Sequence, residues 1–156
     1  MPHSARDSGA GTPILVSIIG NNITSENTAA IGFYGALNSS ASNNFITMEP
    51  PPGGVNQSGI IAAIWGIGQI VNNTIINSAN YGIDFGGWAL AAPGHITYIM
   101  DNTIQNYGTF GVYDNNEHQA VVYVENNLFI SNLSAASAIS AEHPGNNEWI
   151  INGNTV

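Results

Sequence analysis

The sequence predicts an all-β fold, a single-stranded parallel β-helix of about five coils with a ladder of stacked asparagines. Three observations predict it. β-branched residues occur in short runs between clusters of Asn and Gly, which are typical of tight turns. Asn is unusually frequent, with 22 copies, whereas the Glu, Lys and Arg that cover helix surfaces are sparse. One six-residue pattern also returns along the chain at spacings of 23–29 residues.

The repeated pattern reads apolar, any residue, Asn/Asp/Gly, Asn, any residue, apolar. It occupies residues 18–23, 41–46, 70–75, 99–104, 124–129 and 151–156. Its fourth position, called the ladder Asn below, is always asparagine: Asn21, Asn44, Asn73, Asn102, Asn127 and Asn154. Asn tolerates the left-handed backbone conformation at a sharp bend, and its amide can bond to an Asn in the next coil. We therefore expect these residues to form one column along the helix axis.

A second short strand follows each ladder Asn after about ten residues. These strands lie near residues 31–33, 60–61, 83–85, 112–113 and 138–139. Residues 49–54 form an insertion in the second coil, and the strand of the fifth coil comes two residues late. Coils of this kind stack at ~4.8 Å and bury columns of apolar side chains. We assign Ile75, Ile83, Ile104 and Val112 to these inward columns.

The chain divides into a short N-terminal segment and one repeat domain. Residues 1–13 carry Pro, Ser, Gly and the single Arg, and we expect a flexible tail or part of a cap. Residues 14–156 form the predicted β-helix domain. The chain stops inside a copy of the pattern, which predicts that it is part of a longer protein or that another chain covers its open C-terminal end.

Composition excludes several classes of function. The chain has no Lys, one Arg and a net charge of -9, so it cannot neutralise a row of phosphates or dock on anionic lipid. It has no Cys, and no apolar run approaches the ~20 residues that span a bilayer. No signal peptide is recognised. We expect no nucleic-acid partner, no membrane contact, and no cofactor or metal.

The stretches 70–75 with 80–85, and 99–104 with 110–113, resemble the repeats of right-handed parallel β-helix proteins, the pectate-lyase-like superfamily. That group includes pectate lyases, polygalacturonases, alginate epimerases, phage tailspikes and bacterial surface adhesins. The resemblance implies a right-handed coil and an extracellular or cell or virion surface location. It does not carry the enzymes' site residues over. Pectate lyases need basic catalytic residues, and only Arg6 is present. In Tyr81-Gly82-Ile83-Asp84 only the first half of an epimerase motif is matched, and the clustered Asp of polygalacturonases is absent.

Acidic and His residues follow the second strand of three successive coils, and they are the candidate catalytic residues: Asp84, Asp114, Glu117, His118, Glu142 and His143. Both Glu residues of this set lie fifteen positions after a ladder Asn, and both His residues lie sixteen after one. Carboxyl groups held close raise one another's pKa, and a nearby His offers a base. The alternative is that these are ordinary solvated loop residues.

Aromatic residues are the candidates for ligand contact. A chain of net charge -9 repels a polyanionic substrate, so a neutral glycan fits better, and aromatic rings stack on the C–H faces of sugars. The candidate ligand-binding residues are Trp88, Tyr107, Tyr113 and Trp149, with Trp65 as a further platform. The alternative for each is packing in the core or at a coil end. Asn-x-Ser/Thr sequons, which glycosylation would need, begin at Asn22, Asn38, Asn56, Asn72 and Asn132.

Three hypotheses for function remain open. The favoured one is a non-catalytic surface segment that presents loops and binds glycans or neighbouring subunits. The second is a polysaccharide-degrading or -modifying enzyme that uses the acidic and His residues. The third is a filament subunit whose coil ends stack on one another.

Overall fold

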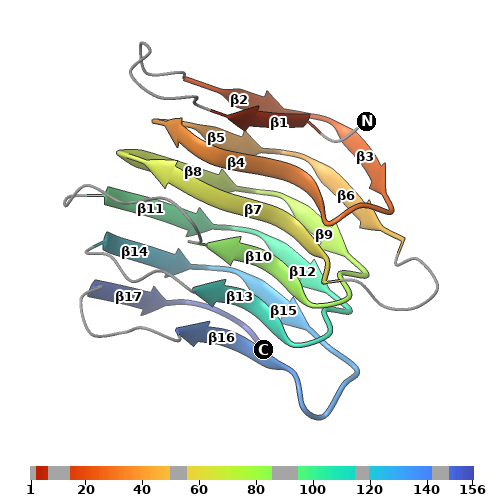
Figure 1. Ribbon diagram of the computed structural model, residues 1–156. Coiled ribbons are helices and arrows are strands. Elements are labelled where there is room, and N and C mark those ends of the chain that lie inside the picture. The colour runs from red at the N-terminus through yellow and green to blue at the C-terminus, as the bar shows by residue number, and fades with distance from the viewer. Residues whose placement is uncertain (1–2, 7–14, 50–55, 86–94, 115–119, 142–147) are drawn as a thin grey trace.

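A computed structural model describes residues 3–6, 15–49, 56–85, 95–114, 120–141 and 148–156. Within these ranges the chain is a parallel β-solenoid without helix, and it makes about four turns between its first and its fifth set of three strands. This confirms the predicted fold class. Figure 1 shows one sheet in front and another behind it, joined by a third at the side. From the N-terminus to the C-terminus the chain forms a right-handed coil.

Sheet A holds the second strand of every coil. Its order is β1-β4-β7-β10-β13-β16, all parallel. The strands are β1 (His3–Arg6), β4 (Ala29–Leu37), β7 (Ser58–Trp65), β10 (Tyr81–Phe85), β13 (Phe110–Asp114) and β16 (Ser137–Ala141). Within residues 1–13, expected as a tail or part of a cap, the described residues 3–6 form a strand that pairs with β4. The prediction that the strand of the fifth coil comes two residues late is confirmed, because Ile139 pairs with Val112.

Sheets B and C share the repeated six-residue pattern. Sheet B has the order β17-β14-β11-β8-β5-β2, and sheet C the order β15-β12-β9-β6-β3. Sheet B contains β2 (Ser17–Ile19), β5 (Ser40–Ser42), β8 (Ile67–Val71), β11 (His95–Met100), β14 (Ala120–Glu125) and β17 (Glu148–Asn152). Sheet C contains β3 (Asn22–Ser25), β6 (Phe45–Met48), β9 (Thr74–Ile76), β12 (Thr103–Gln105) and β15 (Leu128–Ile130). The bend between the two sheets is therefore the Asn-rich centre of the pattern.

The ladder asparagines form the predicted column at this bend. From Asn21 to Asn154, each Nδ2 donates to the Oδ1 of the next ladder Asn at 2.9–3.0 Å. The ladder Asn of the four inner coils are almost completely buried. The amide also reaches backwards, as where Asn102 Nδ2 donates to the Ile70 carbonyl at 2.8 Å. The ladder therefore satisfies backbone groups that the bend leaves without a strand partner.

The expected backbone conformation of the ladder Asn is wrong. The positive φ belongs to the residue before it, as in Asn72 (54°) and Asp101 (58°). That third position of the pattern holds Asn, Asp or Gly, the residue types that accept the left-handed region most readily. The ladder Asn is needed for its amide, and its neighbour for the turn.

The core is a set of apolar columns along the axis. Ile75, Ile83, Ile104 and Val112 are completely buried, as expected. A row of glycines, Gly59, Gly82 and Gly111, lies where the chain turns into sheet A. A Cβ on Gly82 would come 2.3 Å from Ile104 Cγ2 and 2.7 Å from the Gly111 carbonyl oxygen. Glycine is therefore required here, because the side chains of sheet C fill the space.

Candidate functional site

The outer face of sheet A carries the described part of the candidate site. In β4, β7 and β10 the residues Phe33, Ala62 and Phe85 point inward and are buried, so their neighbours on the strand point outward. Register aligns Gly32, Ile61, Asp84 and Tyr113 in one outward row across four strands. Tyr81 and Phe110 form a second row, and Tyr34 lies two residues beyond Gly32. We call Tyr34, Tyr81, Asp84, Phe110 and Tyr113 the sheet A patch.

Asp84 is the acidic centre of this patch. It is half-buried on β10, and burial, with a smaller effect of the nearby Asp114 carboxyl, raises the pKa of Asp84 from 3.8 to about 6. Asp114 ends the neighbouring strand β13, opposite Phe85, and is completely buried. The structure thus brings together two of the six candidate catalytic residues. A carboxyl with a pKa near 6 exchanges its proton near neutral pH.

Three aromatic rings stack beside Asp84. The Tyr81 and Tyr113 centroids are 4.3 Å apart, and the Phe110 ring lies 5.3 Å from that of Tyr113 at an interplanar angle of 8°. Because the rings are nearly parallel, they cover one another's faces, and Tyr113 is almost completely buried. The stack therefore offers a ligand only its outermost ring faces and its edges.

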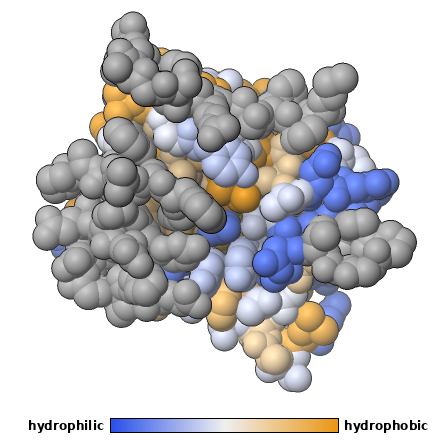
Figure 2. All heavy atoms as spheres, in the orientation of Figure 1, coloured by the Kyte–Doolittle hydropathy of each residue, from blue (hydrophilic) through white to orange (hydrophobic). Residues whose placement is uncertain are grey.

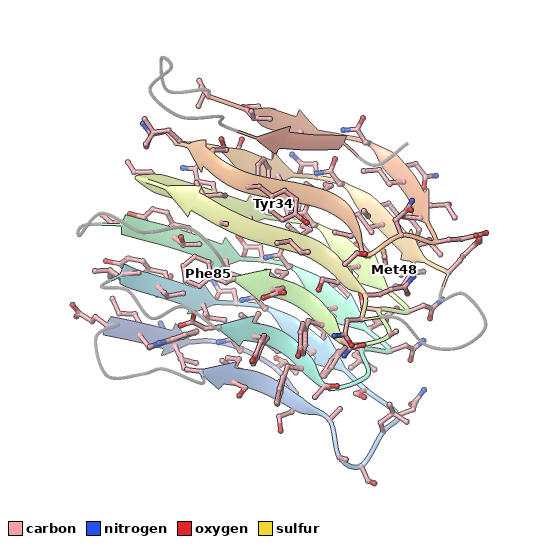
Figure 3. All side chains as sticks on the ribbon, in the orientation of Figure 1. Tyr34, Met48 and Phe85 are labelled. Atoms are coloured by element: carbon pink, nitrogen blue, oxygen red, sulfur yellow. The ribbon has the colours of Figure 1, made fainter. Side chains whose placement is uncertain are left out.

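Tyr34 is the most exposed ring of the patch, at 39%. Its ring lies over Gly32, where a Cβ would come 2.6 Å from Tyr34 Cε2, so glycine makes room for it. Figure 3 shows Tyr34 on β4, and it contrasts with Met48 and Phe85, which are buried. Burial, and then the Asp84 carboxylate, raise the pKa of Tyr34 above its ordinary value of 10. This electrostatic effect indicates that the Tyr34 phenol and the Asp84 carboxyl lie near each other.

The surroundings of the patch are mixed in polarity. Figure 2, which views the molecule from the side of sheet A, shows hydrophobic and hydrophilic residues side by side in the described part of this face. A surface of this kind can contact both the C–H faces and the hydroxyl groups of a sugar.

Two other aromatic candidates pack in or against the core. Tyr107 is 2% exposed and meets Phe129 edge to face at 6.4 Å, so it is a core residue that offers no free ring face. Trp149 lies on β17 opposite the buried Val122 and packs against the core. Its Nε1 is buried without a hydrogen-bond partner among the described residues. For both residues, packing explains the position.

The remaining candidates lie outside the described residues. They are Glu117 and His118 in the segment 115–119, Glu142 and His143 in 142–147, and Trp88 in 86–94. Trp65 is in β7, but its side chain is also outside the description. The alignment of Glu with Glu and of His with His therefore stays a prediction.

Sequence reasoning missed Tyr34, Tyr81 and Phe110. The last two could have been found, because each lies eight residues after its ladder Asn, whereas Asp84 and Tyr113 each lie eleven after theirs. Tyr34 lies thirteen residues after its ladder Asn, and no candidate residue of another coil shares that position, so the pattern did not single it out.

The described residues include no group of three or more His, Cys, Asp or Glu placed to hold a metal ion. They also include no helix long and apolar enough to cross a membrane. Comparisons with protein-family models, with curated proteins and with solved structures found no match to this chain.

Proposed function

We propose that this protein is a non-catalytic segment of an extracellular or virion surface protein, related to the right-handed pectate-lyase-like β-helix proteins, and that it binds a neutral glycan on the sheet A patch. The parallel β-solenoid supports the proposal as a scaffold that holds side chains of successive coils at a fixed spacing. A polyanionic glycan is disfavoured by the net charge of -9.

The observation that carries the proposal is the placement of Asp84 between two aromatic groups on one outer face. Tyr34 lies on β4, and the stack of Tyr81, Tyr113 and Phe110 lies on β10 and β13. Rings contact the C–H faces of sugars, while a carboxyl accepts hydrogen bonds from hydroxyl groups. From β4 to β13 is three strand spacings, or ~14 Å, the length of a short oligosaccharide.

Tyr34 is the ring we expect to contact the sugar directly. The other rings of the patch cover one another, whereas Tyr34 keeps 39% of its surface exposed. The stack and Asp84 then define the far end of the binding surface.

The test measures retention of the purified chain on a panel of neutral and acidic polysaccharides. We expect retention on a neutral polymer, and a loss of at least tenfold in affinity for Tyr34→Ala. Phe45→Ala is the matched control, because Phe45 is an aromatic residue 45% exposed on the outer face of sheet C. Failure of the wild-type chain to bind any polymer, or an equal loss in both variants, would contradict the proposal.

A second candidate function is a polysaccharide-degrading or -modifying enzyme. The raised pKa of Asp84, close to a second carboxyl at Asp114, favours it, because a general acid must carry its proton near the working pH. Release of new chain ends from one polymer over a day, abolished by Asp84→Asn, would establish this function. Retention without new ends supports the binding segment.

A further inference from the structure

The sheet A patch surrounds one ionisable carboxyl with aromatic rings. Register pairs Asp84 on β10 directly with Tyr113 on β13, so the two residues are neighbours on adjacent strands. The Tyr113 ring stacks with the rings of Tyr81 and Phe110, at centroid distances of 4.3 and 5.3 Å. On the other side, the Asp84 carboxylate acts on the pKa of Tyr34, so that phenol is within electrostatic reach. Asp84 therefore lies between Tyr34 and the ring stack.

The ionised form of Asp84 has no positive partner among the described residues. Burial and the Asp114 carboxyl both raise the pKa of Asp84, so both disfavour its charged form. The whole chain has one Arg and no Lys. Arg6 lies on β1, opposite Tyr34 and three strands away from β10 in sheet A. A half-buried carboxylate without a countercharge is costly, and a cation that comes from outside the chain offsets this cost.

The ring stack favours a cation at the same place by a second mechanism. The face of an aromatic ring carries a negative potential, and it attracts an ammonium group within about 6 Å of the ring centre. Tyr81 and Phe110 are half-buried members of the stack, and each keeps part of its surface open. An ammonium group can also donate charge-assisted hydrogen bonds to the Asp84 carboxylate. It therefore gains from the carboxylate and from the rings together, whereas a hydroxyl group there brings no charge.

An organic cation fits this place better than a metal ion does. Metal ions such as Ca²⁺ need several oxygen ligands around them. The neighbours of Asp84 on the two adjacent strands are Ile61 and Tyr113, which offer no carboxylate. The surroundings of the Asp84 carboxyl on the outer face are therefore those of an ammonium site.

From this arrangement we infer that the sheet A patch binds a glycan that carries a free amino group, and that its ammonium group lies against Asp84. The inference rests on the proposed function and narrows its ligand. Neutral sugars contact Tyr34, and one sugar at the centre of the patch is an amino sugar. From β4 to β10 is two strand spacings, or ~10 Å, so these are separate sugars of one oligosaccharide. The net charge of -9, which disfavours a polyanion, attracts this ligand.

The first experiment compares two ligands that differ in their charge: a short oligosaccharide of glucosamine, and the same oligosaccharide with its amino groups acetylated. Calorimetry measures both affinities at neutral pH in about 0.15 M salt, where exposed charges more than ~8 Å apart are largely screened. We expect the wild-type chain to bind the free amine at least tenfold more tightly. Equal affinities, or tighter binding of the acetylated form, overturn the inference and leave the proposed glycan binding intact.

Two variants show whether Asp84 is the origin of this preference. Asp84→Asn keeps the size of the side chain and removes its charge, so it should bind both oligosaccharides with equal affinity. Glu49→Gln also removes one negative charge, but at an exposed position outside sheet A, and it should keep the tenfold preference. A preference that survives in Asp84→Asn, or that is lost in both variants, overturns the inference.

Failure of this inference differs from failure of the proposed function. A chain that does not bind the glucosamine oligosaccharide but is retained on a neutral polysaccharide binds glycans without recognising an amine. A chain that binds neither ligand nor any polymer of the panel contradicts both proposals. Circular dichroism of Asp84→Asn and Glu49→Gln checks that each variant folds before its affinities are compared.

Discussion

Asn73 donates both its backbone N–H and its side-chain Nδ2 to the Oδ1 of Asn102, at 2.9 and 3.0 Å. The same two-donor arrangement joins Asn44 to Asn73 and Asn102 to Asn127. Each ladder Asn therefore fixes the height and the register of the following coil at the bend between sheets B and C. The stacking of coils, and with it the alignment of side chains on sheets A and B, depends on this column.

Asn102→Ala should lower the free energy of unfolding by about 3 kcal/mol, because the Asn73 backbone N–H and the Ile70 carbonyl lose their bonds to the buried Asn102 side chain. Asn73 Nδ2 also loses its bond to Asn102 but keeps those to the Ala41 and Val71 carbonyls. Urea unfolding measures the loss. Asn22→Ala, an exposed residue on the outer face of β3, is the control and should change stability by less than ~0.5 kcal/mol. Equal effects of the two substitutions would show that the ladder does not stabilise the stack.

Asp101→Val tests the separation of the turn residue from the ladder residue. Asp101 has φ 58°, a region that a β-branched residue enters only with strain, so the variant should lose about 1–3 kcal/mol. Asp101→Gly keeps the turn and should be close to neutral. Thermal melting distinguishes the two. If Asp101→Val melts like the wild-type chain, the left-handed position does not constrain the bend.

Gly82→Ala tests the row of glycines beside the core. The new Cβ would press on Ile104 and on the backbone of Gly111, and we expect a loss of about 1–3 kcal/mol or more. Gly68→Ala is the graded comparison, because its Cβ would meet only side chains, at 3.0 Å or more. Gly68→Ala should therefore lower the free energy of unfolding by less than Gly82→Ala. The opposite order in chemical denaturation would contradict the assignment of Gly82 to a filled space.

The fold could be predicted from the sequence because each bend is encoded by a short local pattern, and that pattern recurs along the chain. Each copy of the six-residue pattern encodes one bend, and the fixed position of Asn102 or Asn127 within it needs no knowledge of distant residues. The site is different, since the closeness of Tyr34 and Asp84 depends on the register across three strands and on an insertion between the first two of them. For Tyr107 the sequence left core packing open as the alternative to ligand contact, and the structure buries it between β12 and β13, which its residue type alone does not show.

Asp84→Asn tests the electrostatics of the sheet A patch through pH. The pKa of Asp84 is about 6 in the folded chain and 3.8 without the fold, so the folded state favours the protonated form. Its contribution to stability is fully present below pH ~4 and is lost as the pH rises through about 6. The wild-type chain should therefore be less stable than Asp84→Asn at pH 8, by about 2 kcal/mol, and nearly equal to it at pH 3.5.

Denaturant unfolding of both chains from pH 3.5 to 8 measures this difference directly. Glu49→Gln is the control, because it also removes one negative charge from a chain of net charge -9, but at an exposed position outside sheet A. The comparison separates the effect of burial at Asp84 from the effect of removing one charge. A constant gap between the wild-type chain and Asp84→Asn over the whole range would mean that burial beside Asp114 does not hold a proton on Asp84. The second candidate function would then lose its general acid. Glycan binding through Tyr34 is tested separately, by the retention of Tyr34→Ala on polysaccharides.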